Sequence, residues 1–121
     1  MPTSIVIDDD VSTCEILQTC LEQVGYSVVA VINGQEALNT LQQQTFDLIT
    51  LDLAMPKING AAIFDAIRAD AQHNNAVVVV ITGTPHMIGA EMLEQADYVM
   101  NKPFDVREFA QFAERVSSTR G

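Results

Sequence analysis

Basic residues are scarce in this 121-residue chain, which has six lysines and arginines against 16 aspartates and glutamates and a net charge of −10. This scarcity argues against direct nucleic-acid binding, because DNA and RNA are bound through lysines and arginines that neutralise phosphates. An acidic balance favours a cation or a basic partner as ligand, although many proteins are acidic for solubility only.

Long apolar segments are also missing. No run approaches the ~18 apolar residues that a membrane helix needs. The first ten residues, MPTSIVIDDD, lack the basic start and long apolar stretch of a signal peptide. We therefore expect a cytoplasmic protein that does not bind membranes.

The chain has two cysteines, Cys14 and Cys20. They are six residues apart, with no second pair and no nearby histidine, which argues against a zinc site. On a helix this spacing places them on different faces, so a mutual disulfide is not expected. We interpret both as small residues of a protein from a reducing compartment.

An apolar pattern whose period changes repeatedly organises the chain. Short runs rich in β-branched residues predict strands at 5–7, 26–31, 46–51, 76–81 and 97–100. Apolar residues three and four apart predict helices at 11–24, 33–41, 60–68, 88–93 and 106–116. The alternation predicts a single α/β domain, with a parallel sheet and helices on both of its faces.

Polar residues follow four of the five predicted strands. Asp8 and Asp9 come after the first, Asp52 after the third, Thr82 after the fourth and Lys102 after the fifth. Ligands of open parallel sheets bind at the carboxyl ends of the strands, so we expect these side chains to meet. Carboxylate oxygens with incomplete protein coordination suit Mg²⁺, which retains waters and accepts phosphate oxygens.

The same set of side chains predicts a reaction. A carboxylate can attack phosphorus and form an aspartyl phosphate. The incoming phosphoryl charge must then be neutralised, and Mg²⁺, the Lys102 ammonium and the Thr82 hydroxyl can do so by position and charge. Gly83, beside Thr82, leaves room for the phosphoryl group.

Four segments follow one another along the chain: IVIDDD, DLITLDLAMPKINGA, VVVVITGT and NKPF. In these segments and their order, and over essentially its full length, the sequence resembles the receiver domain of bacterial two-component response regulators, the CheY-like family. The resemblance implies one receiver domain over residues 1–121, with a flavodoxin-like (βα)5 doubly wound sheet of strand order 2-1-3-4-5. The chain would be either a stand-alone regulator or the N-terminal receiver of a longer protein.

The resemblance also implies roles. Asp52 would be the phosphoacceptor and, with Asp8 and Asp9, a Mg²⁺ ligand. The backbone carbonyl of Ala54 would be another ligand, whereas Thr82 and Lys102 would bind the phosphoryl group. The loop after the phosphoacceptor would be shaped by Met55, Pro56 and Gly60.

The family accepts phosphate from a sensor histidine kinase or phosphotransfer protein and slowly hydrolyses it. No turnover of a separate substrate is therefore expected. The face made by the fourth helix, fifth strand and fifth helix would then regulate a downstream effector protein or domain.

Two other functions compete with this one. The pattern Asp8-x-Asp10-x-Ser12 is loosely similar to the nucleophile motif of haloacid-dehalogenase-type phosphatases, but it does not explain Asp52, and we assign Asp10 to the start of a helix. A pseudo-receiver would have the fold and bind proteins without being phosphorylated.

Some positions depart from the family pattern or carry no function here. The family's aromatic switch position, three before Lys102, is Val99, and we expect Tyr98 to face the other way. We interpret Asp47 as only a polar residue before a strand. His73 and His86 fall in predicted loops, and we expect both on the surface.

Overall fold

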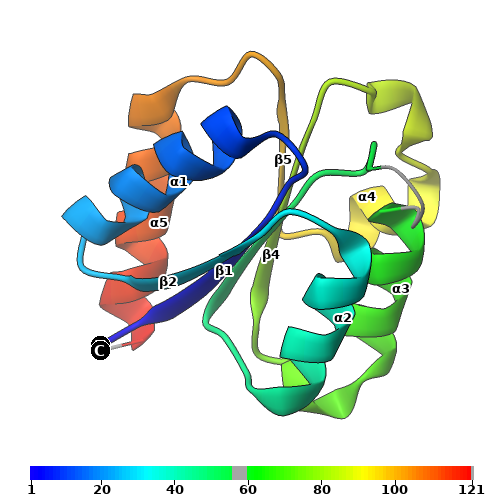
Figure 1. Cartoon of the computed structure of the whole chain (residues 1–121), viewed down its shortest axis with the longest axis horizontal. Helices are drawn as coiled ribbons and strands as arrows, with labels where there is room; N and C mark the ends of the chain where they lie inside the picture. Colours follow the sequence, from blue (N-terminus) through cyan, green and yellow to red (C-terminus); the bar gives the residue numbers. More distant parts are fainter. Residues whose placement is uncertain (56–59, 121) are drawn as a thin grey trace.

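The computed structural model describes residues 1–55 and 60–120 and has one five-stranded parallel sheet of order β2-β1-β3-β4-β5 (Figure 1). Each of the five predicted strands is present, as is the predicted order. The strands are β1 (Thr3–Ile7), β2 (Ser27–Val31), β3 (Leu48–Leu51), β4 (Val77–Thr82) and β5 (Tyr98–Asn101).

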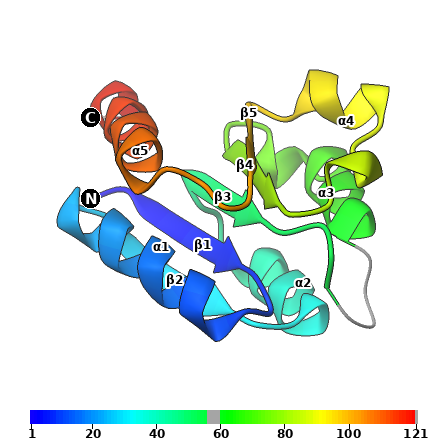
Figure 2. The same cartoon turned by 90° about the horizontal axis from the view of Figure 1, so that it is seen from above.

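The helices form a layer on each face of this sheet, as the alternation of elements predicts (Figure 2). One face is covered by α1 (Val11–Gln23) and α5 (Val106–Arg120), and the other by α2 (Gly34–Gln43), α3 (Gly60–Ala69) and α4 (Ala90–Gln95). Two short 3₁₀ turns, η1 (Ala71–His73) and η2 (Pro85–Met87), flank β4. None of the helices in the described ranges is both long and apolar enough to cross a membrane.

Side-chain caps fix where the first two helices begin. The Asp10 carboxylate accepts the Ser12 backbone N–H at 3.0 Å, so its assignment to a helix start is confirmed. The Asn33 side chain accepts the Glu36 N–H at 2.8 Å in the same way at α2. After α1, Gly25 has a φ of +100°, a left-handed conformation that glycine adopts without steric cost.

The register of β5 separates Tyr98 from Val99. Val99 pairs with Val80 and packs into the core on the α2–α3 side, as its position three residues before Lys102 in the sequence predicts. Tyr98 lies on the opposite face, where its ring stacks on Phe112 with the centroids 4.7 Å apart. The predicted orientation of Tyr98 is confirmed.

One surface prediction is wrong. His73 is only 2% exposed, because η1 folds back against the end of α2 and the imidazole Nε2 bonds to the Leu41 carbonyl at 2.9 Å. Leu93 and Val106, which belong to the apolar spacing that predicts the fourth and fifth helices, are 61% and 45% exposed. Both lie near helix ends, where fewer neighbouring elements cover an apolar stripe.

Asp47 also has a structural role that its position before β3 did not predict. Its carboxylate accepts the Thr3 backbone N–H at 2.8 Å, and its own N–H donates to the Thr3 carbonyl at 3.0 Å. This reciprocal pair fixes the start of β1 next to β3. The prediction for His86, in contrast, is confirmed, since its side chain is exposed in η2.

Candidate functional site

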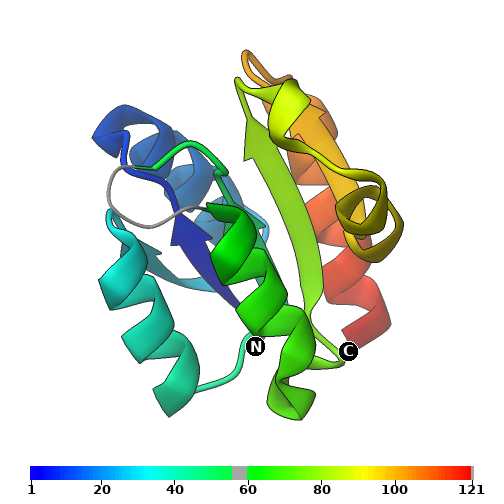
Figure 3. The ribbon, with the colours of Figure 1, turned by 90° about the vertical axis from the view of Figure 1, so that its right-hand side faces the viewer.

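The predicted site residues gather at the edge of the sheet where the strands end, opposite the N-terminus and the end of α5 (Figure 3). Asp8 follows β1, Asp52 follows β3, and Thr82 is the last residue of β4. Backbone bonds extend the sheet past the strand ends: Asp52 N–H donates to the Ile7 carbonyl at 3.0 Å and Lys102 N–H to the Thr82 carbonyl at 2.9 Å. These bonds place the side chains on one framework.

Three carboxylates from two strand ends form a compact cluster. Asp8, Asp9 and Asp52 each present an oxygen, and these atoms lie within 4.8 Å of one another. Asp8 and Asp52 are 1% and 5% exposed, whereas Asp9 is exposed to solvent. Burying carboxylates so close together is costly unless cations offset their charge. The cluster therefore requires positive charge.

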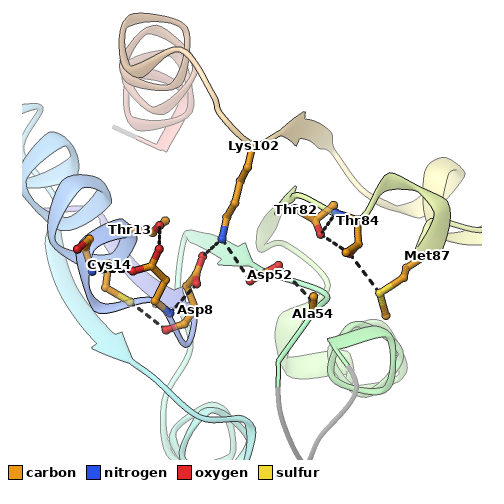
Figure 4. A network of polar contacts seen from close by, with 11 residues as sticks. Asp8, Thr13, Cys14, Asp52, Ala54, Thr82, Thr84, Met87 and Lys102 are labelled. Carbon is orange, nitrogen blue, oxygen red and sulfur yellow. Dashed lines mark hydrogen bonds and ion pairs between the residues drawn. The ribbon is translucent and has the colours of Figure 1, made fainter.

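Lys102 supplies part of that charge, and it reaches both buried carboxylates (Figure 4). Its Nζ donates to Asp8 Oδ2 at 2.8 Å and to Asp52 Oδ2 at 3.3 Å. Burial alone would lower the pKa of the Lys102 ammonium, but the hydrogen bond to Asp8 and the charges of both carboxylates outweigh it and raise that pKa. Lys102 is therefore firmly protonated.

The Asp8 carboxyl has its pKa raised, chiefly because burial disfavours its charged form and, to a lesser degree, because Asp52 is near. Bonds from Lys102 and from the Asp10 backbone N–H only partly offset this effect. One ammonium against three carboxylates leaves a charge of −2. A hard divalent cation that prefers oxygen ligands fits both the charge and the donor set.

Ala54 occupies the turn just beyond Asp52. Its backbone N–H donates to Asp52 Oδ1 at 3.2 Å, which holds the carboxylate in place. Its carbonyl as a metal ligand remains a prediction. Of the loop residues predicted to shape this site, Met55 is buried, Gly60 begins α3, and Pro56 lies outside the described residues.

Thr82 is fully buried at the end of β4, and its hydroxyl bonds to the Thr84 hydroxyl at 2.8 Å. Sequence reasoning placed Thr82 at the site but missed this bond. The sequence signal for this bond is a pair of threonines two residues apart. That spacing is common in turns, so it does not single out this bond. Sequence reasoning also missed Cys14, whose thiol donates to the Asp8 carbonyl at 3.1 Å and supports the turn after β1.

The phosphatase-like pattern is accounted for by the start of α1. The Asp10 carboxylate accepts both the Ser12 N–H and the Thr13 hydroxyl, each at 3.0 Å. These bonds lower the pKa of Asp10, the Thr13 bond most strongly. Asp10 therefore serves as a helix cap.

Comparisons with known proteins agree with this geometry. The model of the response regulator receiver domain family matches residues 5–114. Among curated relatives, the sensor protein GacS of Pseudomonas syringae pv. syringae is 35% identical over 115 residues, which are 91% of this chain and 13% of GacS. The CpxR homolog of Haemophilus influenzae, a transcriptional regulatory protein, is 35% identical over 112 residues, which are 89% of this chain and 47% of the CpxR homolog. The chain thus spans less than half the length of either relative.

Solved structures show the same fold. The response regulator TrrA of Thermotoga maritima, in complex with Mg²⁺ and beryllofluoride, has a TM-score of 0.83 and 28% identity, covering 96% of this chain and 99% of TrrA. A CheY-like receiver domain from Methylobacillus flagellatus has a TM-score of 0.85 at 22% identity, covering 96% and 98% of the two chains, and supports the fold alone. With its family model, its curated relatives and its strand order in agreement, this chain belongs to the receiver domain family of two-component response regulators.

Proposed function

We propose that this receiver domain accepts a phosphoryl group on Asp52 from the phosphohistidine of a sensor histidine kinase or phosphotransfer protein. The observation that carries the proposal is the placement of the Asp52 carboxylate. It is buried, it lies within bonding distance of Lys102, and it shares a cluster with Asp8 and Asp9. Mg²⁺ is the cofactor that this acidic cluster suits.

The proposed transfer is a single displacement at phosphorus. An Asp52 oxygen forms the new P–O bond as the P–N bond of the donor breaks, and the imidazole leaves with the electron pair. The Ala54 N–H fixes Asp52 Oδ1, and Lys102 stays protonated to hold a phosphoryl oxygen. Mg²⁺, held by Asp8, Asp9, Asp52 and the Ala54 carbonyl, would neutralise charge on the phosphoryl oxygens.

The same proposal extends to the rest of the system. We place the reaction in the cytoplasm, without turnover of any separate substrate, in one domain that spans residues 1–121. The phosphorylated form would regulate a downstream effector protein or domain. The names of the relatives support both kinds of partner, since one is a sensor protein and another a transcriptional regulatory protein.

Intact-mass spectrometry after incubation with acetyl phosphate tests the proposal. The wild-type chain should gain one phosphoryl group with Mg²⁺ and almost none with EDTA. Asp52→Asn should gain none under either condition. A pseudo-receiver would remain unmodified, and a gain by Asp52→Asn at the wild-type rate would refute the assignment of Asp52.

A further inference from the structure

A short series of hydrogen bonds leads away from the site along the segment after β4 (Figure 4). The Thr84 backbone N–H donates to Thr82 Oγ1 at 3.0 Å, and the two threonine hydroxyls lie 2.8 Å apart. The Thr84 hydroxyl then donates to the Met87 sulfur at 3.2 Å. We call Thr82, Thr84 and Met87 the threonine–methionine relay.

The relay has a direction, because a hydroxyl carries only one proton. The proton of Thr84 is donated to the Met87 sulfur, so the bond between the two hydroxyls must use the proton of Thr82. Thr82 Oγ1 also accepts the Thr84 backbone N–H. In this conformation the single donor of Thr82 is already engaged.

We propose that Thr84 is a positioning residue that holds the Thr82 hydroxyl in a resting bond, in competition with the phosphoryl group. This inference rests on the proposed function. Thr82 lies beside Lys102 at the site, joined to it by the backbone bond of 2.9 Å between Lys102 N–H and the Thr82 carbonyl. To donate to a phosphoryl oxygen, Thr82 must release Thr84.

That exchange would be transmitted to the start of α4. Met87 belongs to η2 and packs, half-buried, with Val99 and Ile88 against the core on the α2–α3 side. When Thr82 turns away, the Thr84 hydroxyl loses its donor and its bond to Met87 is free to rearrange. Tyr98 is stacked on Phe112 on the other face of the sheet, so this route does not involve it.

Beryllofluoride with Mg²⁺ is a suitable probe, because it mimics a phosphoryl group without a covalent step. Its binding can be followed by NMR of the methionine methyl groups, of which the chain has five. The Met87 resonance is identified by its loss in Met87→Leu. Four proteins are compared with the wild type: Thr84→Val, Thr84→Ser, Met87→Leu and Thr40→Val.

Thr84→Val removes the hydroxyl and keeps both the shape of the side chain and the backbone N–H bond to Thr82. We expect it to bind beryllofluoride about fivefold more tightly, the equivalent of one ordinary hydrogen bond of ~1 kcal/mol. Thr84→Ser should restore most of the wild-type affinity. Met87→Leu, which removes a weak acceptor, should give a smaller gain of about twofold.

Thr40→Val is the matched control, since it removes a threonine hydroxyl that donates to the Glu36 carbonyl at 2.8 Å, a bond within α2. It should bind beryllofluoride with the affinity of the wild type.

The Met87 methyl resonance should shift when beryllofluoride binds to the wild type. In Thr84→Val without beryllofluoride, this resonance should already lie nearer to its chemical shift in the bound state.

The outcomes separate this inference from the proposed function. Absence of beryllofluoride binding by the wild-type chain would refute the proposed function and the relay with it. Normal binding with equal affinity in Thr84→Val and Thr40→Val would refute the relay alone. A Met87 methyl that does not move on binding would refute the transmission to α4.

Discussion

Replacing Gly60 with alanine should disturb the site without touching any of its side chains. Gly60 is the first residue of α3, and its N–H donates to the Leu53 carbonyl at 3.1 Å. A Cβ at this position would lie 2.4 Å from Leu53 Cα and 2.6 Å from the Asp52 carbonyl oxygen. Both are backbone atoms, so no side chain can rotate away to relieve the overlap.

The size of the effect follows from these distances. Tolerable Cβ contacts begin near 3.4 Å, so Leu53 Cα must retreat by about 1 Å. Leu53 is fully buried, and such overpacking of a core typically costs ~1–3 kcal/mol. A shift of that size at Asp52 would also misplace the carboxylate that we propose as the phosphoacceptor, at a cost of up to ~100-fold in the rate of phosphorylation.

Two assays test this prediction, with Gly89→Ala as the control. A Cβ on Gly89 would meet nothing within 4 Å, and Gly89 lies outside the carboxylate cluster. Urea unfolding followed by circular dichroism should show the loss of stability in Gly60→Ala, and intact mass with acetyl phosphate should show slower phosphorylation. Gly89→Ala should be phosphorylated at the wild-type rate. The prediction is contradicted if the free energy of unfolding of Gly60→Ala lies within about 0.5 kcal/mol of the wild-type value and its phosphorylation is as fast. A difference of that size is the usual scatter of neutral substitutions.

Three further predictions follow from the same structure. Burial and the nearby Asp8 charge raise the pKa of the Cys14 thiol to about 11, so iodoacetamide at pH 8 should leave it unmodified in the folded chain and alkylate it in urea; fast native labelling would contradict this. Tyr98 should keep one rotamer in structures with and without beryllofluoride, and a turn of its ring toward Thr82 would refute our assignment of Val99 to the family's aromatic switch position. The phosphorylated form should last minutes to hours, because neither Ala54 nor Thr84 is suited to orient an attacking water; a half-life of seconds would contradict this, and Ala54→Asn combined with Thr84→Glu should shorten it.

The order of elements and the place of the site could be predicted from the sequence for one physical reason. Parallel strands present their carboxyl ends at a common edge, so residues that directly follow β1, β3 and β5 have to meet there. Asp8, Asp52 and Lys102 meet within hydrogen-bonding distance for this reason. The orientation of Tyr98 was predictable in the same way, from the alternation of side chains along a strand.

What the sequence did not predict depends on contacts between distant segments. His73 was assigned to the surface because it falls in a predicted loop, with no pattern of partner residues around it. Its burial results from the fold of η1 against the end of α2, which brings it to the Leu41 carbonyl. The overlap that a side chain at Gly60 would cause with the backbone of Leu53 likewise depends on how the start of α3 packs against that segment in the folded chain.

Chemical localisation of the phosphoryl group tests the central claim most directly. Borohydride reduces an aspartyl phosphate to homoserine, so phosphorylation in Mg²⁺ followed by reduction and peptide sequencing identifies the acceptor. Our account predicts homoserine at position 52 alone, and none when Mg²⁺ is removed with EDTA. Homoserine at Asp8 or Asp9, or the same yield at position 52 with EDTA, would contradict it.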